Sequence, residues 1–138
     1  MERDELYERG LVVRREMFGS AGAEVQTEST REINGKLQEI VTRWCFGDIW
    51  QREGLDRRTR SMITVAMLVA LGREWELKIH TKGALANGVT EEELREISLH
   101  ALLYCGIPSA NEGLRTLDAV LQEERPDSRL FDPAQRGE

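Results

Sequence analysis

The sequence predicts an all-helical protein. Apolar residues recur at spacings of three and four along most of the chain, which is the period of an amphipathic helix. Strand-like alternation is missing, and Val, Ile and Thr are not clustered between turn signals. With 138 residues, 40% hydrophobic and 32% charged, the composition fits one globular domain. We expect about six helices over residues 1–125 and a mobile, polar tail over 126–138.

The first third of the chain predicts two helices. A first helix over 4–18 carries a rough apolar stripe and ends at Gly19. A polar stretch over 20–30 follows, and a second helix is expected over 30–46. The apolar positions of this second helix are Ile33, Leu37, Ile40, Val41 and Trp44. A loop over 47–55 then carries Ile49 and Trp50.

The next predicted helix, over 56–71, is the most apolar part of the chain. Asp56 has the character of an N-cap. The second half, over 62–71, is apolar nearly all round, and such a helix must be buried on all sides. Because a domain of this size has little room for that, we expect this helix to be buried against other subunits.

The last three helices have clear boundaries. One is expected over 73–86, where Asn87 and Gly88 stop it. Thr90 and Glu93 have the spacing of a capping box, which opens a helix over 90–105. The chain then breaks at 106–108, and Pro108 suits the first turn of a helix that ends near 124.

The composition excludes several classes of function. The net charge is −6 and no block of Lys or Arg stands out, so neither nucleic acid nor a membrane surface is an expected partner. A secretory leader is absent, which predicts a cytoplasmic location. Cys45 and Cys105 form no CxxC pair, and we expect both to be buried. Without a clustered ligand set or a Gly-rich phosphate loop, we expect no metal and no cofactor.

Arg73, Glu76 and His80 are the first candidates for chemistry. Their spacing places them on one stripe of a helix, and the flanking Leu77 and Ala84 indicate that the stripe faces inward or toward a cleft. A buried imidazole beside a carboxylate has the tunable proton affinity that acid–base catalysis needs. The alternative is an ion-pair network that only satisfies a core histidine.

Three arginines crowd the first turn of the helix over 56–71. Arg57, Arg58 and Arg60 stand where the helix macrodipole disfavours positive charge. A broken local rule of this kind is typical of functional sites, and guanidinium groups suit carboxylate ligands. In the alternative interpretation, Asp56 and Glu53 neutralise these cations at the surface.

Aromatic residues offer a further candidate pocket. Four large side chains are close in sequence and could line a small-molecule site or pack in the core: Trp44, Phe46, Ile49 and Trp50. His100 lies beside an apolar stripe that includes Tyr104, which predicts a histidine in the core or in an interface. His100 and Tyr104 are the next candidates for proton transfer after His80.

Five segments of the chain resemble the carboxymuconolactone decarboxylase family. They are TRWCFGDIW at 42–50, GLDRRTRS at 54–61, ELKIH at 76–80, GALANGVT at 83–90 and YCGIPSAN at 104–111. The likeness covers about residues 5 to 122. It implies an all-helical fold shared with alkylhydroperoxidase D-like proteins, assembled as trimers or hexamers. The peroxidase relatives carry Cys-x-x-Cys-x-x-x-His, whereas this chain has Arg73, Glu76 and His80 there, which excludes disulfide exchange.

The resemblance implies decarboxylation of 4-carboxymuconolactone to the 3-oxoadipate enol-lactone, in protocatechuate breakdown, without a cofactor. The expected catalytic residues are His80 and Glu76. The expected substrate-binding residues are Arg57, Arg58, Arg73, Trp44, Trp50 and Tyr104.

At three positions the chain differs from the family, and these differences leave the identity of the substrate open. The family usually has a polar segment where this chain has Gly22, often histidine at Trp44, and proline at Glu53. Three hypotheses therefore stay open: lactone decarboxylation, another cofactor-free reaction of an organic acid such as decarboxylation, isomerisation or cyclisation, and a non-catalytic ligand-binding oligomer.

Overall fold

The computed structural model describes residues 4–19, 22–23 and 32–124. Every regular element in these ranges is helical, so the predicted all-helical class is confirmed. Within the same ranges, no helix is both long enough and apolar enough to cross a membrane. The predicted tail over 126–138 lies outside the described residues, as does most of the polar stretch over 20–30.

The chain divides into two compact units. One comprises Met1–Ser61 with Lys82–Gly88, and the other Met62–Thr81 with Val89–Glu138. Two helices pass from one unit into the other: α4 (Arg57–Leu71) and α5 (Glu74–Ala86). The sequence-based expectation of one domain over residues 1–125 stays a prediction.

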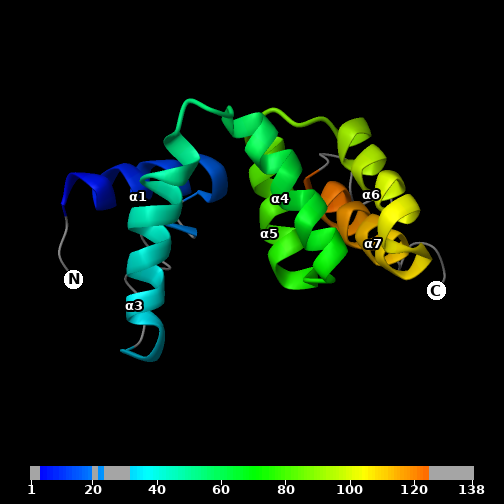
Figure 1. The fold of residues 1–138 in the computed structure, drawn as a ribbon, viewed down its shortest axis with the longest axis horizontal. Helices are drawn as coiled ribbons and strands as arrows, with labels where there is room; N and C mark the ends of the chain where they lie inside the picture. The colour runs from blue at the N-terminus through cyan, green and yellow to red at the C-terminus, as the bar shows by residue number, and fades with distance from the viewer. Residues whose placement is uncertain (1–3, 20–21, 24–31, 125–138) are drawn as a thin grey trace. The chain divides into compact units, whose positions relative to one another are not determined.

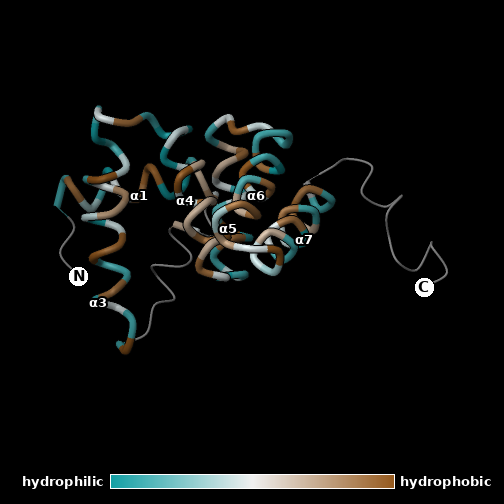
Figure 2. Tube along the Cα trace, turned by 45° about the vertical axis from the view of Figure 1, so that its right-hand side comes forward, coloured by the Kyte–Doolittle hydropathy of each residue, from teal (hydrophilic) through white to brown (hydrophobic). Residues whose placement is uncertain are grey.

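In the first unit, α1 (Glu5–Phe18) lies across the end of α3 (Glu32–Ile40), as Figure 1 shows. The Asp4 carboxylate caps α1 by accepting a hydrogen bond from the Tyr7 N–H at 2.9 Å. The helix ends at Gly19, whose φ of 72° favours glycine. Over its described range α3 buries none of its side chains. Hydrophobic and hydrophilic residues alternate along it in Figure 2.

A π-helix, η2 (Val41–Phe46), continues from α3, and a 3-10 turn, η3 (Ile49–Gln51), follows it. The Gly47 N–H donates to the Thr42 carbonyl five residues back, at 3.0 Å. The backbone of η2 packs tightly on α1, because a Cβ at Gly10 would lie 1.8 Å from the Thr42 carbonyl oxygen. The side chains that meet behind this contact form the core of the unit: Val13, Met17, Phe46 and Trp50.

In the second unit, α6 (Glu91–Cys105) and α7 (Ile107–Glu124) pack against each other. The predicted capping box is present: Thr90 Oγ accepts from the Glu93 N–H at 3.1 Å, and Glu93 accepts from the Thr90 N–H at 2.9 Å. The buried apolar side chains of α6 and α7 are Leu94, Ala101, Ala110, Leu117, Val120 and Leu121. Val65 and Val69 of α4 are fully buried as well.

Candidate functional site

α5 carries the histidine that the sequence singled out. Leu77 and Ala84 are buried and His80 is half-buried, as expected for the inward face of this helix. The stripe was expected to face inward or toward a cleft: Arg73 and Glu76 are exposed rather than buried, and Arg73 borders a small cavity. Arg73 precedes the first helical residue, Glu74, so it belongs to the turn that enters α5.

The surroundings of His80 favour its neutral form. Burial lowers the pKa of the imidazole below its usual 6.5, because the charged ring loses solvation. The Glu76 carboxylate, one turn earlier, acts in the opposite direction by favouring the cation. These two opposing influences give His80 an adjustable proton affinity, which is what a proton donor or acceptor requires.

The arginines at the start of α4 have partners that the sequence analysis did not foresee. Arg57 forms an ion pair with Glu16 of α1. Arg58 Nε donates to the Gly88 carbonyl at 3.3 Å. Arg60 donates to two backbone carbonyls at 3.1 and 3.2 Å, those of Leu55 and Arg52.

Asp56 acts as the predicted N-cap of α4. Its carboxylate accepts a hydrogen bond from the Thr59 N–H at 2.7 Å. The backbone and side-chain hydrogen bonds from Thr59 lower the pKa of this carboxyl. Asp56 therefore stabilises the helix start and also interacts electrostatically with Arg58, as the alternative interpretation expected, while Glu16 pairs with Arg57.

The aromatic candidates separate into core and surface residues. Trp50 is only 7% exposed and its ring stacks on Phe46 with centroids 5.8 Å apart, as the core-packing interpretation predicts. Trp44 is 52% exposed, and Tyr104 of α6 is 78% exposed. The expectation of two buried cysteines is wrong for Cys105, which is exposed, whereas Cys45 is half-buried.

His100 is exposed in the single chain, so of its two expected places, core or interface, the core is excluded and the interface stays a prediction. The centroid of its ring lies 5.2 Å from the centroid of the Tyr104 ring. It borders an open groove of about 520 Å³ between α4 and α6. The other residues of this groove are Met62, Ala66, Glu92, Glu93, Glu96 and Ile97.

Gly22 occupies a position that leaves no space for a side chain. A Cβ there would lie 2.4 Å from the Phe18 Cβ, and the Gly22 carbonyl accepts a hydrogen bond from Arg14 Nε at 2.8 Å. Gly22 therefore serves a packing contact with Phe18 and a hydrogen bond from Arg14 in this chain.

One residue beside α5 gave no signal in the sequence. Arg115 of α7 borders a small cavity together with Arg73 and Leu77. A single arginine on the polar face of an amphipathic helix cannot be told from an ordinary surface residue by spacing. The candidate residues of the second unit are therefore Arg73, Glu76, His80, Tyr104 and Arg115, whereas Arg57, Arg58, Trp44 and Trp50 belong to the first.

Comparisons with known proteins agree with the sequence motifs. The family model described as the carboxymuconolactone decarboxylase family matches residues 35–119. A 4-carboxymuconolactone decarboxylase of Acinetobacter baylyi is 38% identical over 123 residues, which cover 89% of this chain and 92% of the relative. A nitrosuccinic acid decarboxylase of Metarhizium robertsii is 41% identical over 109 residues, which cover 79% of this chain and 76% of that protein.

Both relatives are decarboxylases, which are carbon–carbon lyases, so the enzyme class expected from the sequence is confirmed. The family model spans more than half of the chain, and the Acinetobacter relative aligns over nearly its whole length. The chain therefore belongs to the carboxymuconolactone decarboxylase family.

Proposed function

We propose that the protein removes CO2 from a small organic acid without a cofactor, and that 4-carboxymuconolactone is its first candidate substrate. The products are then CO2 and the 3-oxoadipate enol-lactone, in protocatechuate catabolism. The observation that carries this proposal is His80, half-buried on α5 with a pKa lowered by burial and influenced by Glu76. The relative from Acinetobacter baylyi, similar over nearly its whole length, supports the choice of substrate.

The reaction needs three contributions from the protein. When the bond to the departing carboxylate breaks, its electron pair moves through the ring double bond onto the lactone carbonyl oxygen. The substrate is thus its own electron sink, and a proton must then reach a ring carbon. The protein has to hold the remaining carboxylate, stabilise the charge on oxygen, and supply that proton.

In this proposal His80 delivers the proton and Glu76 orients the imidazole and adjusts its charge. The entry of a doubly charged substrate raises the pKa of His80, because nearby negative charge favours the imidazolium. The remaining binding residues are proposed from the sequence: Arg57, Arg58 and Arg73 for carboxylates, and Trp44, Trp50 and Tyr104 for the pocket. Of the aromatic three, Trp50 lies in the core and stacks on Phe46.

A second candidate substrate is 2-nitrosuccinate, which the similarity to the Metarhizium enzyme favours. Its decarboxylation follows the same kind of mechanism. The electron pair moves onto the nitro oxygens, and a proton then adds to the carbon that lost CO2. Both candidates are acids with a second carboxylate and an electron acceptor next to the reacting carbon.

The test is direct. Protein dialysed against a chelator is incubated separately with 4-carboxymuconolactone and 2-nitrosuccinate, and CO2 release is compared with the rate in the absence of protein. We expect multiple turnovers of one of the two acids without added metal or cofactor. Activity that disappears with the chelator and returns with one metal contradicts the cofactor-free mechanism. Turnover of neither acid contradicts both candidate substrates and leaves another cofactor-free reaction of an organic acid or a non-catalytic ligand-binding oligomer.

A further inference from the structure

The second unit contains a small cavity between α4, α5 and α7. Its volume is about 70 Å³. Such a space holds a few water molecules or one carboxylate group, but not a whole organic acid. The residues that line it are Leu68, Val69, Gly72, Arg73, Glu74, Leu77, Glu112, Gly113, Arg115 and Thr116.

Two arginines at this cavity differ from Arg57 and Arg60 near the start of α4. Among the described residues, neither Arg73 nor Arg115 has a side-chain hydrogen bond or an ion pair. Arg57, by contrast, is paired with Glu16, and Arg60 is bound to backbone carbonyls. Two uncommitted guanidinium groups that face one small space make a forked donor set suited to a carboxylate.

The cavity lies at the N-terminal end of α5, and His80 follows it along the helix. Leu77 lines the cavity and His80 follows three residues later, which is about 4.5 Å of helix rise. Side chains in a helix lean toward its N-terminus, so the imidazole leans toward the end where the cavity lies. The first backbone N–H groups of α5 point the same way and favour an anion there.

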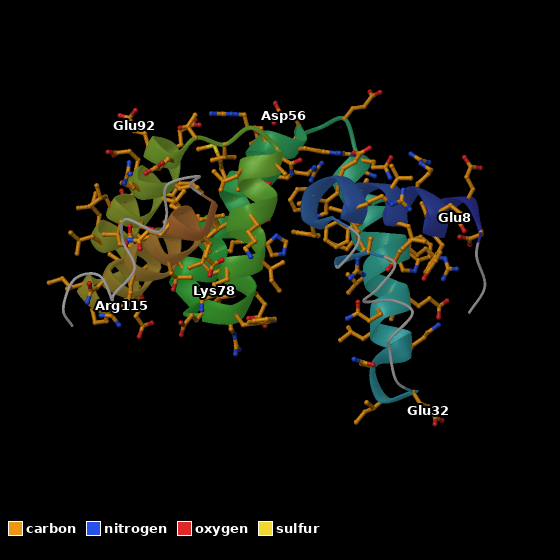
Figure 3. The ribbon with its side chains drawn as sticks, turned by 180° about the vertical axis from the view of Figure 1, so that it is seen from behind. Glu8, Glu32, Asp56, Lys78, Glu92 and Arg115 are labelled. Carbon is orange, nitrogen blue, oxygen red and sulfur yellow. The ribbon has the colours of Figure 1, made fainter. Side chains whose placement is uncertain are left out.

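We propose that this cavity binds the carboxylate that the substrate keeps, through Arg73 and Arg115, and so holds the reacting carbon near His80. The assignment rests on the proposed function and makes it more specific, since it moves carboxylate binding from the start of α4 to the α5–α7 side. Arg115, labelled on α7 in Figure 3, becomes a specificity-determining residue for acids with a second carboxylate.

Two carboxylates border the same cavity and compete with the ligand. Glu112 Oε2 would lie 4.0 Å from a Cβ at Gly72, and Glu74 begins α5. Neither forms an ion pair with Arg73 or Arg115. Removal of the charge of Glu112 should therefore strengthen the binding of an anion, a result that a purely structural role for the arginines does not predict.

Succinate is the probe for this subsite, because it has two carboxylates but no electron acceptor that allows decarboxylation. Its binding is measured by calorimetry, and the Nε–H signals of Arg73 and Arg115 are followed by NMR. We expect Arg115→Ala to raise the Kd at least about tenfold, Arg115→Lys to raise it less, and Glu112→Gln to lower it. Arg95→Ala is the matched control, since Arg95 is an exposed cation paired with Glu91 on α6.

Failure of this subsite and failure of the proposed function give different results. Succinate binding needs no turnover, so it can be measured in a protein that is inactive on both candidate acids. The subsite is refuted if wild-type protein shows no saturable succinate binding. It is equally refuted if Arg115→Ala and Arg95→Ala bind alike, whether or not the protein releases CO2 from either acid.

Discussion

His80 combines two roles at the residue scale, because the burial that makes it a useful proton carrier also couples it to folding. Its pKa in the folded protein lies below the usual 6.5. At a pH between the folded-state pKa and 6.5, the unfolded chain binds more protons at this histidine than the folded chain does. The contribution of His80 to stability is therefore complete above pH 6.5 and is lost as the pH falls from 6.5 to the folded-state pKa.

This gives a pH prediction that urea unfolding can check. The free energy of unfolding of the wild type should fall more steeply between pH 6.5 and pH 5 than that of His80→Gln. His100→Gln is the control, and it should keep the wild-type slope because the buried imidazole is still present. If the free energy of unfolding depends on pH in the same way for wild type and His80→Gln, burial does not lower the pKa of this histidine.

Two buried hydroxyl groups give a matched pair of stability predictions. Ser98 Oγ of α6 is fully buried and has no hydrogen-bond partner among the described residues. Thr42 Oγ1 of η2 is equally buried but accepts a hydrogen bond from Arg14 Nη1 at 3.0 Å. Ser98→Ala should leave stability unchanged or raise it, whereas Thr42→Val should cost about 1–3 kcal/mol by leaving a buried donor unsatisfied. Thermal unfolding of both variants checks the contrast, and a loss for Ser98→Ala as large as that for Thr42→Val would refute it.

The candidate site could be predicted only where spacing carries information. His80 and Glu76 stand one turn apart on a helix whose apolar pattern marks the buried side, so the pair could be found. The position of Arg115 at a cavity could not be predicted, because residues distant in sequence form that cavity. The exposure of Cys105 was also missed, since the preference of cysteine for burial says nothing about a helix end.

At the scale of elements, the helices followed from their caps and stop signals to within a residue or two. Asp56 and Thr90 cap helix starts through local hydrogen bonds, and the glycines at 19, 88 and 106 adopt a positive φ where helices end, so these boundaries could be predicted from the sequence. The π-helix η2 was missed and read as a continuation of the helix over 30–46. Its hydrogen bonds span five residues instead of four, and periodicity in a six-residue segment does not distinguish the two.

The contact between α1 and η2 depends on Gly10. A Cβ there would lie 1.8 Å from a backbone oxygen, and neither helix can move away without opening the core of the first unit. Gly10→Ala should therefore destabilise the protein by about 2 kcal/mol or more, the usual scale for overpacking against backbone. Gly54→Ala is the control, because a Cβ at that position has nothing within 4 Å. Equal urea midpoints for the two variants would show that the helices part at little cost.

At the scale of the whole molecule, α4 leaves an apolar face uncovered in the single chain. Val65 and Val69 are buried, but Met67 and Leu71 are 59% and 68% exposed. Ala66 and Ala70, on the same side, are exposed as well, and the helix has no charged residue after Arg60. A soluble monomer seldom keeps such a face in water, so we infer that α4 packs against other copies of the chain.

The oligomer is tested by light scattering at micromolar concentration. Wild-type protein should have a mass that is a multiple of three chains, as the family resemblance implies, and Met67→Arg should dissociate it by burying a charge in an apolar interface. Asp118→Arg, a charge reversal on the exposed face of α7, should leave the assembly intact. A well-folded wild-type monomer would contradict this assignment of the α4 face.

The central claim is that His80 delivers the proton, and the turnover of His80→Gln on the acid that the wild type decarboxylates tests it most directly. We expect kcat to fall about a hundredfold or more with thermal unfolding little changed at pH 7.5, which is the usual loss when a positioned acid or base is removed. Glu76→Gln, which affects only the orientation and charge of the imidazole, should reduce kcat less. If His80→Gln keeps near-wild-type turnover with an unchanged melting temperature, His80 is only a packed histidine and the proton must come from another group.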